Sequence, residues 1–381
     1  MGVPDCVPEG ICGFTLESED INEGIDQKGD GWYVAMGAVC CFREAWTGRD
    51  TDQCVWHAET EGKTAENLLG ADPPSEGGER FDGAVLSRAT LRDSDRLRGG
   101  GLVAADLTQA DLRGSDLSGA DLGFADLTYV ILRDGVLSGA DLRFADLTYG
   151  SFHDADLSEG DLRNASAYAA VFVRATLVDA ELGDTDLTEA NLEDADLSGA
   201  DLRGANLWGA SLKNATITDG IIHDVDFSHA NLRNTDFAGV EFESVDCTGA
   251  HFRGADLTDT SFRDVIFSGA NFSRVDLSRA DLRNADLSGV DLSRANLSDV
   301  DLQNADLSET DLSHVDLRNA HLSGAILSGA KLYKTDFRDA DLSGTAFSGA
   351  DLYKTDLSNA DLSETDCSGA DLSEAYSDET L

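Results

Sequence analysis

The amino-acid sequence predicts a repeat solenoid preceded by a small cysteine-rich module. Two observations support the solenoid: an apolar residue recurs at every fifth position without interruption, and the residues around it follow one compositional pattern. A third observation sets the module apart, because five of the seven cysteines and three of the four tryptophans lie within residues 1–80. With 381 residues, 41% of them hydrophobic, the chain is long enough for one extended repeat array.

The five-residue register begins at Leu97 and continues to Leu372 through 56 consecutive pentapeptides. A strand repeats every two residues and a helix about every 3.6, so neither regular element explains this spacing. The central residue is nearly always Leu or Phe, a small residue usually stands two positions before it, and Asp or Asn stands one position before it. The exceptions at the centre are Ala167, Ile217, Ile222, Cys247 and Cys367. We expect large and small residues to alternate inside a narrow tube, since large residues alone would overpack it.

A shorter register precedes the main one. Phe81, Leu86 and Leu91 are also five residues apart, but they are offset by one position. We therefore expect one extra residue between Leu91 and Leu97.

Pentapeptides such as ADLSG, ANLWG, ADLRN and ANFSR fit the pattern A(D/N)LXX. In this pattern the chain resembles the pentapeptide-repeat family over residues 81–375. The resemblance implies an all-β solenoid, a right-handed quadrilateral β-helix in which each pentapeptide forms one side and four make a coil. Leu202 should then stack directly on Ile222 in the next coil. Cys247 and Cys367 would lie about 29 Å apart, too far for a disulfide, and we interpret both as small buried hydrophobes.

Because four pentapeptides would complete a coil, every fourth pentapeptide falls on the same side, and the exposed positions sort into four faces. One face, centred on Leu107 and every twentieth residue as far as Cys367, has no Lys or Arg in its 14 pentapeptides, and we call it the base-free face. It includes the aromatic residues Tyr129, Tyr149, Tyr168 and Trp208. Nine aspartates precede its central residues: Asp106, Asp126, Asp146, Asp186, Asp226, Asp246, Asp286, Asp306 and Asp366.

Arginine gathers on the two flanking faces, where we expect it to neutralise carboxylates of its own and neighbouring coils. These arginines are Arg113, Arg133, Arg233 and Arg253 on one face, and Arg143, Arg163, Arg203, Arg263 and Arg283 on the other. The base-free face could instead dock a partner with a basic surface. Family members that mimic DNA and bind type II topoisomerases suggest one such partner. The alternative is that repeat duplication alone propagated the pattern along one face.

The net charge of −45 argues against direct binding of nucleic acid, because phosphate recognition needs a basic surface. Two interpretations of the acidity remain: a DNA-like decoy for a basic protein, or solubility in high salt. Residues 1–80 carry 17 acids and 5 bases, so acidity is not confined to the repeats. This distribution, with 22 Arg and only 6 Lys, resembles proteins of salt-accumulating halophiles such as haloarchaea.

The N-terminal module is expected to span residues 1–70, with a Pro- and Gly-containing linker at 71–80. The stretch CVWH places Cys54 and His57 at a spacing that can ligate one ion, and Cys12 and Cys41 would complete a Cys₃His zinc site. Cys6 and Cys40 are alternates; free thiols or disulfides are the other possibilities. The arrangement resembles short Cys/His modules that precede pentapeptide repeats in haloarchaeal proteins. We expect the module to cap the first coil, whose edge would otherwise stay unpaired.

Catalysis is not expected. The sequence lacks G-x-S-x-G, a Walker loop and H-E-x-x-H, and a filled tube has no pocket for a substrate. No apolar run reaches the roughly 20 residues of a membrane span, and no signal peptide is evident, so we expect a cytoplasmic protein. Topoisomerase-binding relatives dimerise through a C-terminal segment; here residues 376–381 form only a short tail, so either a monomer or an end-to-end dimer is expected.

Overall fold

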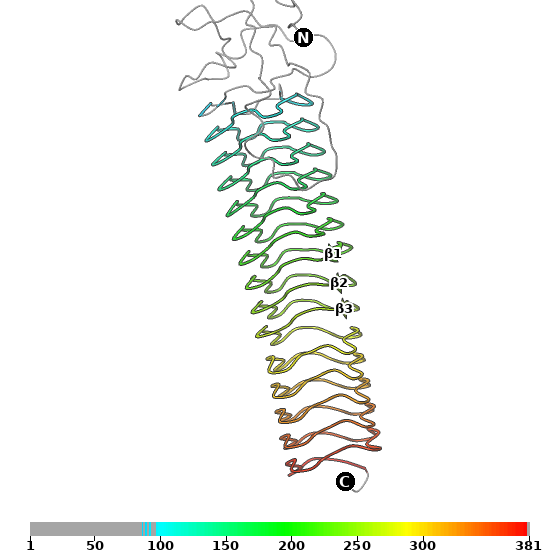
Figure 1. Ribbon diagram of the computed structural model, residues 1–381. Helices are drawn as coiled ribbons and strands as arrows, with labels where there is room; N and C mark the ends of the chain where they lie inside the picture. The colour runs from blue at the N-terminus through cyan, green and yellow to red at the C-terminus, as the bar shows by residue number, and fades with distance from the viewer. Residues whose placement is uncertain (1–85, 87, 90, 93–96, 379–381) are drawn as a thin grey trace, which may run out of the picture.

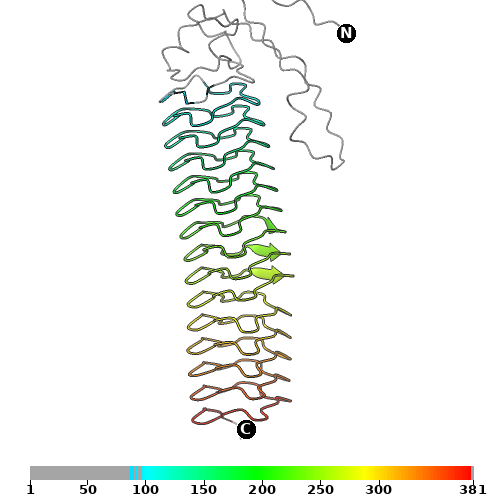
Figure 2. The ribbon, with the colours of Figure 1, turned by 60° about the vertical axis from the view of Figure 1, so that its left-hand side comes forward.

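A computed structural model describes residues 97–378 together with Leu86, Arg88, Ala89, Leu91 and Arg92. Over this part the backbone winds into a stack of similar coils (Figures 1 and 2). The module at 1–70, its proposed zinc ligands and the linker at 71–80 lie outside the described residues, as do Phe81 and residues 379–381. The expectations for those parts stay predictions.

Each coil consists of four pentapeptides and pairs with the next coil in parallel. The bridges join equivalent positions of successive coils, as Asp201 and Ile221 do. Leu202 donates its N–H to the carbonyl of Ile221 at 3.0 Å, which places it over Ile222 as predicted. Each of the four faces therefore carries one pentapeptide per coil.

Three consecutive coils contain short strands. β1 (Ile222–His223), β2 (Glu241–Glu243) and β3 (Ser261–Arg263) form one parallel sheet in the order β1-β2-β3 (Figure 2). The register aligns Phe242 with Phe262. Elsewhere in the described coils pairing is limited to single bridges, because the chain turns a corner in every pentapeptide.

Most corners of the described coils are β-turns that begin at a central residue. The N–H of Ala110 donates to the carbonyl of Leu107 at 2.9 Å, and Gln109, the third residue of this turn, has a φ of 57°. A positive φ at that position is typical of a type II turn and favours Gly, as at Gly209 with a φ of 66°. Tyr129 adopts the same conformation with a φ of 57°, at a cost of about 1 kcal/mol.

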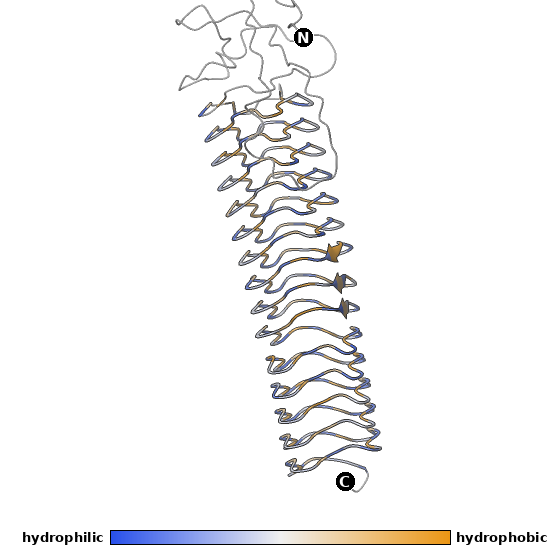
Figure 3. Cartoon of the chain, in the orientation of Figure 1, coloured by the Kyte–Doolittle hydropathy of each residue, from blue (hydrophilic) through white to orange (hydrophobic). Residues whose placement is uncertain are grey.

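The interior is a hydrophobic core that runs along the described coils. Leu207 and Ala205, the large and small inward residues of one pentapeptide, are both buried. Figure 3 shows hydrophobic and hydrophilic residues alternating along each coil. Where Thr replaces the small Ala, its hydroxyl is satisfied: Thr185 donates to the carbonyl of Leu162 at 2.8 Å. The predicted alternation of large and small inward residues is confirmed.

The extra residue between the two registers is also confirmed. In the main register the N–H of Leu107 donates to the carbonyl of Asp126, which immediately precedes the central residue of the next coil. Leu86 and Leu91 donate in the same way to the carbonyls of Asp106 and Asp111. Leu86 thus stacks on Leu107. These two residues are one position further apart along the chain than stacked central residues of the main register, such as Leu107 and Leu127. The additional residue is accommodated before Leu97, and the first residues still stack on the coil that follows them.

The two cysteines of the repeat differ in burial. Cys247 is fully buried, as predicted, and desolvation raises the pKa of its thiol well above the ordinary value. The prediction is wrong for Cys367, which is only half-buried. It lies in the last described coil, and no described coil covers its outer side.

The ladder between coils lacks successive hydrogen bonds around Phe267. By the pattern of the other coils, Phe267 and Gly269 should donate to the carbonyls of Asp286 and Ser288, but these hydrogen bonds are missing among the described residues. The bridge between Ile266 and Asp286 is missing as well. A cavity of about 520 Å³ opens at this point, and we call it the fissure.

Candidate interaction surface

The nine aspartates of the base-free face lie in one column, because bridges connect successive coils in register. Direct neighbours occur in three runs: Asp106 to Asp146, Asp226 to Asp246, and Asp286 to Asp306. Asp186 and Asp366 stand alone, since uncharged residues occupy the other coils: Ser166, Asn206, Ile266, Ile326 and Ala346. The column is therefore an interrupted ladder, densest toward the N-terminal coils.

Each of these nine carboxylates is held by its own pentapeptide. Oδ1 accepts the backbone N–H of the Ser or Thr two positions later, at 2.8 to 3.0 Å. The Ser288 hydroxyl and N–H keep the pKa of Asp286 below its ordinary value, and Ser368 does the same for Asp366. None of the nine forms an ion pair with a described residue. Their charges are fixed in place, and no described residue neutralises them.

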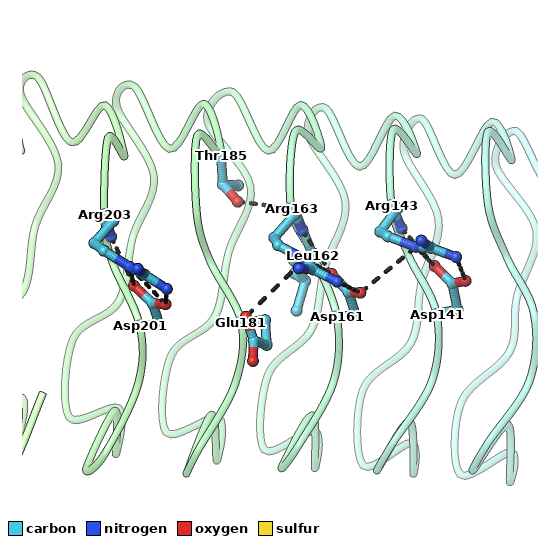
Figure 4. Close-up of polar contacts among 9 residues, drawn as sticks. All are labelled: Asp141, Arg143, Asp161, Leu162, Arg163, Glu181, Thr185, Asp201 and Arg203. Atoms are coloured by element: carbon cyan, nitrogen blue, oxygen red, sulfur yellow. Dashed lines mark hydrogen bonds and ion pairs between the residues drawn. The ribbon is translucent and has the colours of Figure 1, made fainter. Parts of the chain in front are cut away.

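The flanking face of Arg143 has the opposite arrangement (Figure 4). Arg143 donates from Nε to Oδ1 of Asp141 at 2.9 Å and forms a second hydrogen bond to Oδ2. Its Nε also lies 3.5 Å from the carboxylate of Asp161 in the next coil. Similarly, the hydrogen bond from Arg203 keeps the pKa of Asp201 below its ordinary value. Neutralisation within and between coils is confirmed here.

The same prediction is wrong for part of the other flanking face. Arg113 does pair with Asp111, at 2.7 Å. Arg133, Arg233 and Arg253 form no ion pair with a described carboxylate. The reason lies two positions earlier, where the pairing Asp is replaced by Ile131, Asn231 and His251 respectively.

Aromatic side chains border the densest part of the base-free face. Tyr129 stacks on Tyr149 with ring centroids 5.0 Å apart, and each is nearly half exposed. On the preceding corner Phe124 stacks on Phe144, also at 5.0 Å. The two phenylalanines were missed by sequence analysis because they belong to the neighbouring pentapeptides. Their position in the sequence could have revealed them, because both lie two residues after a central Leu. That position forms a corner that borders two faces.

Two further contacts complete this end of the face. The hydroxyl of Tyr168 donates to Glu189 at 3.0 Å, which ties the aromatic edge to an acid in the next coil. Arg88, which precedes the main register, donates to the side chain of Gln109 at 3.2 Å. The face is therefore base-free only from Leu107 onward.

The described residues contain no group of three or more His, Cys, Asp and Glu placed to hold a metal ion. The proposed ligands Cys12, Cys41, Cys54 and His57, with the alternates Cys6 and Cys40, lie outside them. Among the described residues, no helix has the length and apolar character required to cross a bilayer.

Comparison with solved structures gives similarity to repeat proteins at low TM-scores. HetL, a pentapeptide repeat protein involved in heterocyst differentiation regulation from the cyanobacterium Nostoc sp., is 28% identical over 73% of this chain and 92% of that chain, with a TM-score of 0.19. QnrB1, a plasmid-mediated fluoroquinolone resistance protein, is 20% identical over 57% of this chain and 89% of that chain, with a TM-score of 0.26. A search of curated proteins found no match.

The family profile described as pentapeptide repeats matches the chain in eight copies. The matched segments are 102–134, 132–164, 155–194, 180–219, 221–259, 276–313, 305–344 and 340–376. They cover well over half of the sequence, and their coils have the period of four pentapeptides that a right-handed quadrilateral β-helix requires. The chain belongs to the pentapeptide repeat family.

Proposed function

We propose that the protein is a non-enzymatic interaction scaffold whose base-free face binds the basic surface of a DNA-binding protein, with a type II topoisomerase as the first partner to test. The observation that carries the proposal is the contrast between faces. Seven arginines elsewhere in the described coils form two-pronged hydrogen bonds with an Asp of their own pentapeptide, whereas the nine aspartates of the base-free face have no cationic partner there.

The chemistry of the face suits such a partner. Fixed carboxylates without counter-charges attract a basic surface and orient it. The stacked rings of Phe124 with Phe144 and Tyr129 with Tyr149 supply apolar area that charges alone lack, and aromatic residues often contribute most of the binding energy at protein interfaces. We place the contact on the coils of Asp126 and Asp146, where both features coincide, and the protein in the cytoplasm.

A supercoiling assay with a type II topoisomerase tests the proposal. The double variant Asp126→Asn with Asp146→Asn keeps the side-chain oxygen that accepts the backbone N–H but removes two charges. The matched control is Asp236→Asn with Asp256→Asn on the opposite face, where the same backbone hydrogen bond is present at 3.0 Å. We expect the unaltered protein and the control to inhibit supercoiling, and the first variant to inhibit much less.

Two outcomes would contradict the proposal. If the two variants behave alike, net acidity rather than the base-free face is responsible, as adaptation to high salt would predict. If the unaltered protein has no effect on a topoisomerase and captures no basic protein, a second function is favoured: a structural rod that presents the module expected at 1–70 to a partner, with acidity due only to halophilic adaptation. Both assays need the highest salt concentration that the partner tolerates, because salt screens the attraction.

A further inference from the structure

On one face of four successive coils the charge is positive, although the rod as a whole is acidic. On the face centred on Leu212 and every twentieth residue to Phe272, the pentapeptides of four successive coils read ASLKN, ANLRN, AHFRG and ANFSR. They contain no Asp or Glu, in a chain with 73 acidic residues. Their four basic side chains line a common groove of about 330 Å³, which we call the cationic groove: Lys213, Arg233, Arg253 and Arg274.

The bases of the cationic groove lack the Asp partner that seven arginines have on other coils. Where Asp normally precedes the central residue, these coils carry Ser211, Asn231 and His251. The Oδ1 atom of Asn231 is buried without a hydrogen bond, so this neutral amide does not hold Arg233 as Asp141 holds Arg143. None of the four bases forms an ion pair with a described carboxylate.

The groove also offers neutral donors. By the pattern of the preceding coils, where the N–H of Asn214 donates to the carbonyl of Arg233 at 2.9 Å, the N–H of Gly254 should donate to Ser273. That hydrogen bond is missing among the described residues, and Gly254 lines the groove together with Asn234. Four charged donors therefore share one small space with an amide side chain and a glycine.

The spacing of the bases favours an anion between them. Lys213, Arg233 and Arg253 occupy equivalent positions of adjacent coils, which are about 4.8 Å apart at strand spacing, and Arg274 follows in the next coil. Unit charges at such distances repel one another unless an anion separates them. Guanidinium groups match the geometry of phosphate oxygens with paired N–H donors.

The neighbouring faces limit the size of the ligand. Asp236, Asp256 and Asp276 form a carboxylate ladder on the next face, and Asp226 and Asp246 belong to the base-free face on the other side. A wide polyanion such as duplex nucleic acid or an anionic membrane would meet these carboxylates. A narrow ligand would lie on the cationic groove alone.

We propose that the cationic groove is a binding site for a small phosphate-bearing anion, with inorganic pyrophosphate as the representative ligand. The site is independent of the base-free face. A bound anion would also reduce the repulsion among the four bases, so it would stabilise the coils from Lys213 to Arg274.

Isothermal titration of the full chain with pyrophosphate tests this proposal, in the presence of a chelator because exposed aspartates attract divalent cations. We expect saturable binding that weakens by about tenfold for each of Arg233→Gln and Arg253→Gln, the effect of losing one charge-assisted hydrogen bond. Arg203→Gln and Arg283→Gln are matched controls, since these arginines are already paired with Asp201 and Asp281, and they should leave binding unchanged.

A second variant tests the cause without removing any arginine. The double variant Asn231→Asp with His251→Asp recreates the pairing that Asp201 forms with Arg203. The same arrangement, an Asp two positions before an Arg, occurs on many other coils of this fold. We expect the double variant to fold, by circular dichroism, and to abolish binding. Binding of ADP with the same dependence on variants would support a phosphate carried by a nucleotide. Unchanged pyrophosphate binding in the double variant, no pyrophosphate binding at all, or tighter binding of duplex DNA would overturn the proposal.

Discussion

Replacing Phe242 by Ala should destabilise the middle of the rod more than any surface substitution. The ring is fully buried in β2, with its centroid 4.9 Å from that of Phe262 and 5.2 Å from that of Phe237. Emptying such a site costs roughly 3–5 kcal/mol, because apolar contacts are lost and the tube cannot collapse to fill the void. The matched control is Phe144→Ala, since Phe144 also stacks on another ring but is 50% exposed. Its φ is positive, and Ala is no more strained than Phe in that conformation.

Urea unfolding followed by circular dichroism at one fixed salt concentration measures the difference. A long repeat array need not unfold in one step, so hydrogen exchange of the coils around residue 242 should accompany it. We expect a change below about 1 kcal/mol for the control, as for most surface substitutions. Equal destabilisation by the two variants, or a larger effect of Phe144→Ala, would refute the assignment of stability to the filled interior.

Four other outcomes follow from the structure and sequence. The amides of Phe267 and Gly269 should exchange faster than that of Leu307, which keeps its ladder hydrogen bond; equal rates would mean that the fissure is closed in solution. The pKa of Asp201 is lower in the folded protein than in the unfolded chain, where it is about 4, so the pairing with Arg203 stabilises the fold fully above about pH 4. This stabilisation is lost as the pH falls through the pKa of Asp201 in the folded protein. Asp201→Asn should therefore make the free energy of unfolding less sensitive to acid, and an unchanged pH profile would contradict this. A thiol reagent mapped by mass spectrometry should modify Cys367 before Cys247 in the native protein, since burial raises the pKa of the Cys247 thiol. Metal analysis of the full chain should find one zinc per chain, and Cys54→Ser should lower it; a metal-free protein with reduced thiols would exclude the Cys₃His site.

The register of the rod could be predicted from sequence because a single type of position determines it. One large apolar residue in five has no place on a polar surface, so its column fixes which residues stack, as Leu202 and Ile222 show. The offset before Leu97 could be predicted for the same reason. The burial of Cys367 could not, since it depends on what covers the last coil rather than on the repeat itself.

Pairing between surface side chains was harder to predict. Counting residues by face placed Arg233 and Arg253 with the other arginines, but the two-pronged pairing at this position forms only when an Asp lies two positions earlier. Likewise, counting by pentapeptide leaves Phe124 and Phe144 out of the base-free face, although corner residues border two faces. The fissure has no signature in the register, because Phe267 is a regular central residue whose ladder hydrogen bond is nevertheless missing.

The coil of four pentapeptides makes the rod tolerant of some changes in length and sensitive to others. Adding or deleting a whole coil would leave every downstream side chain on its original face and alter only the reach of the molecule. An insertion of one pentapeptide would keep the core intact and yet turn everything after it by a quarter revolution. Evolution could thus reassign whole surfaces of this protein with a single small indel that preserves the inward pattern.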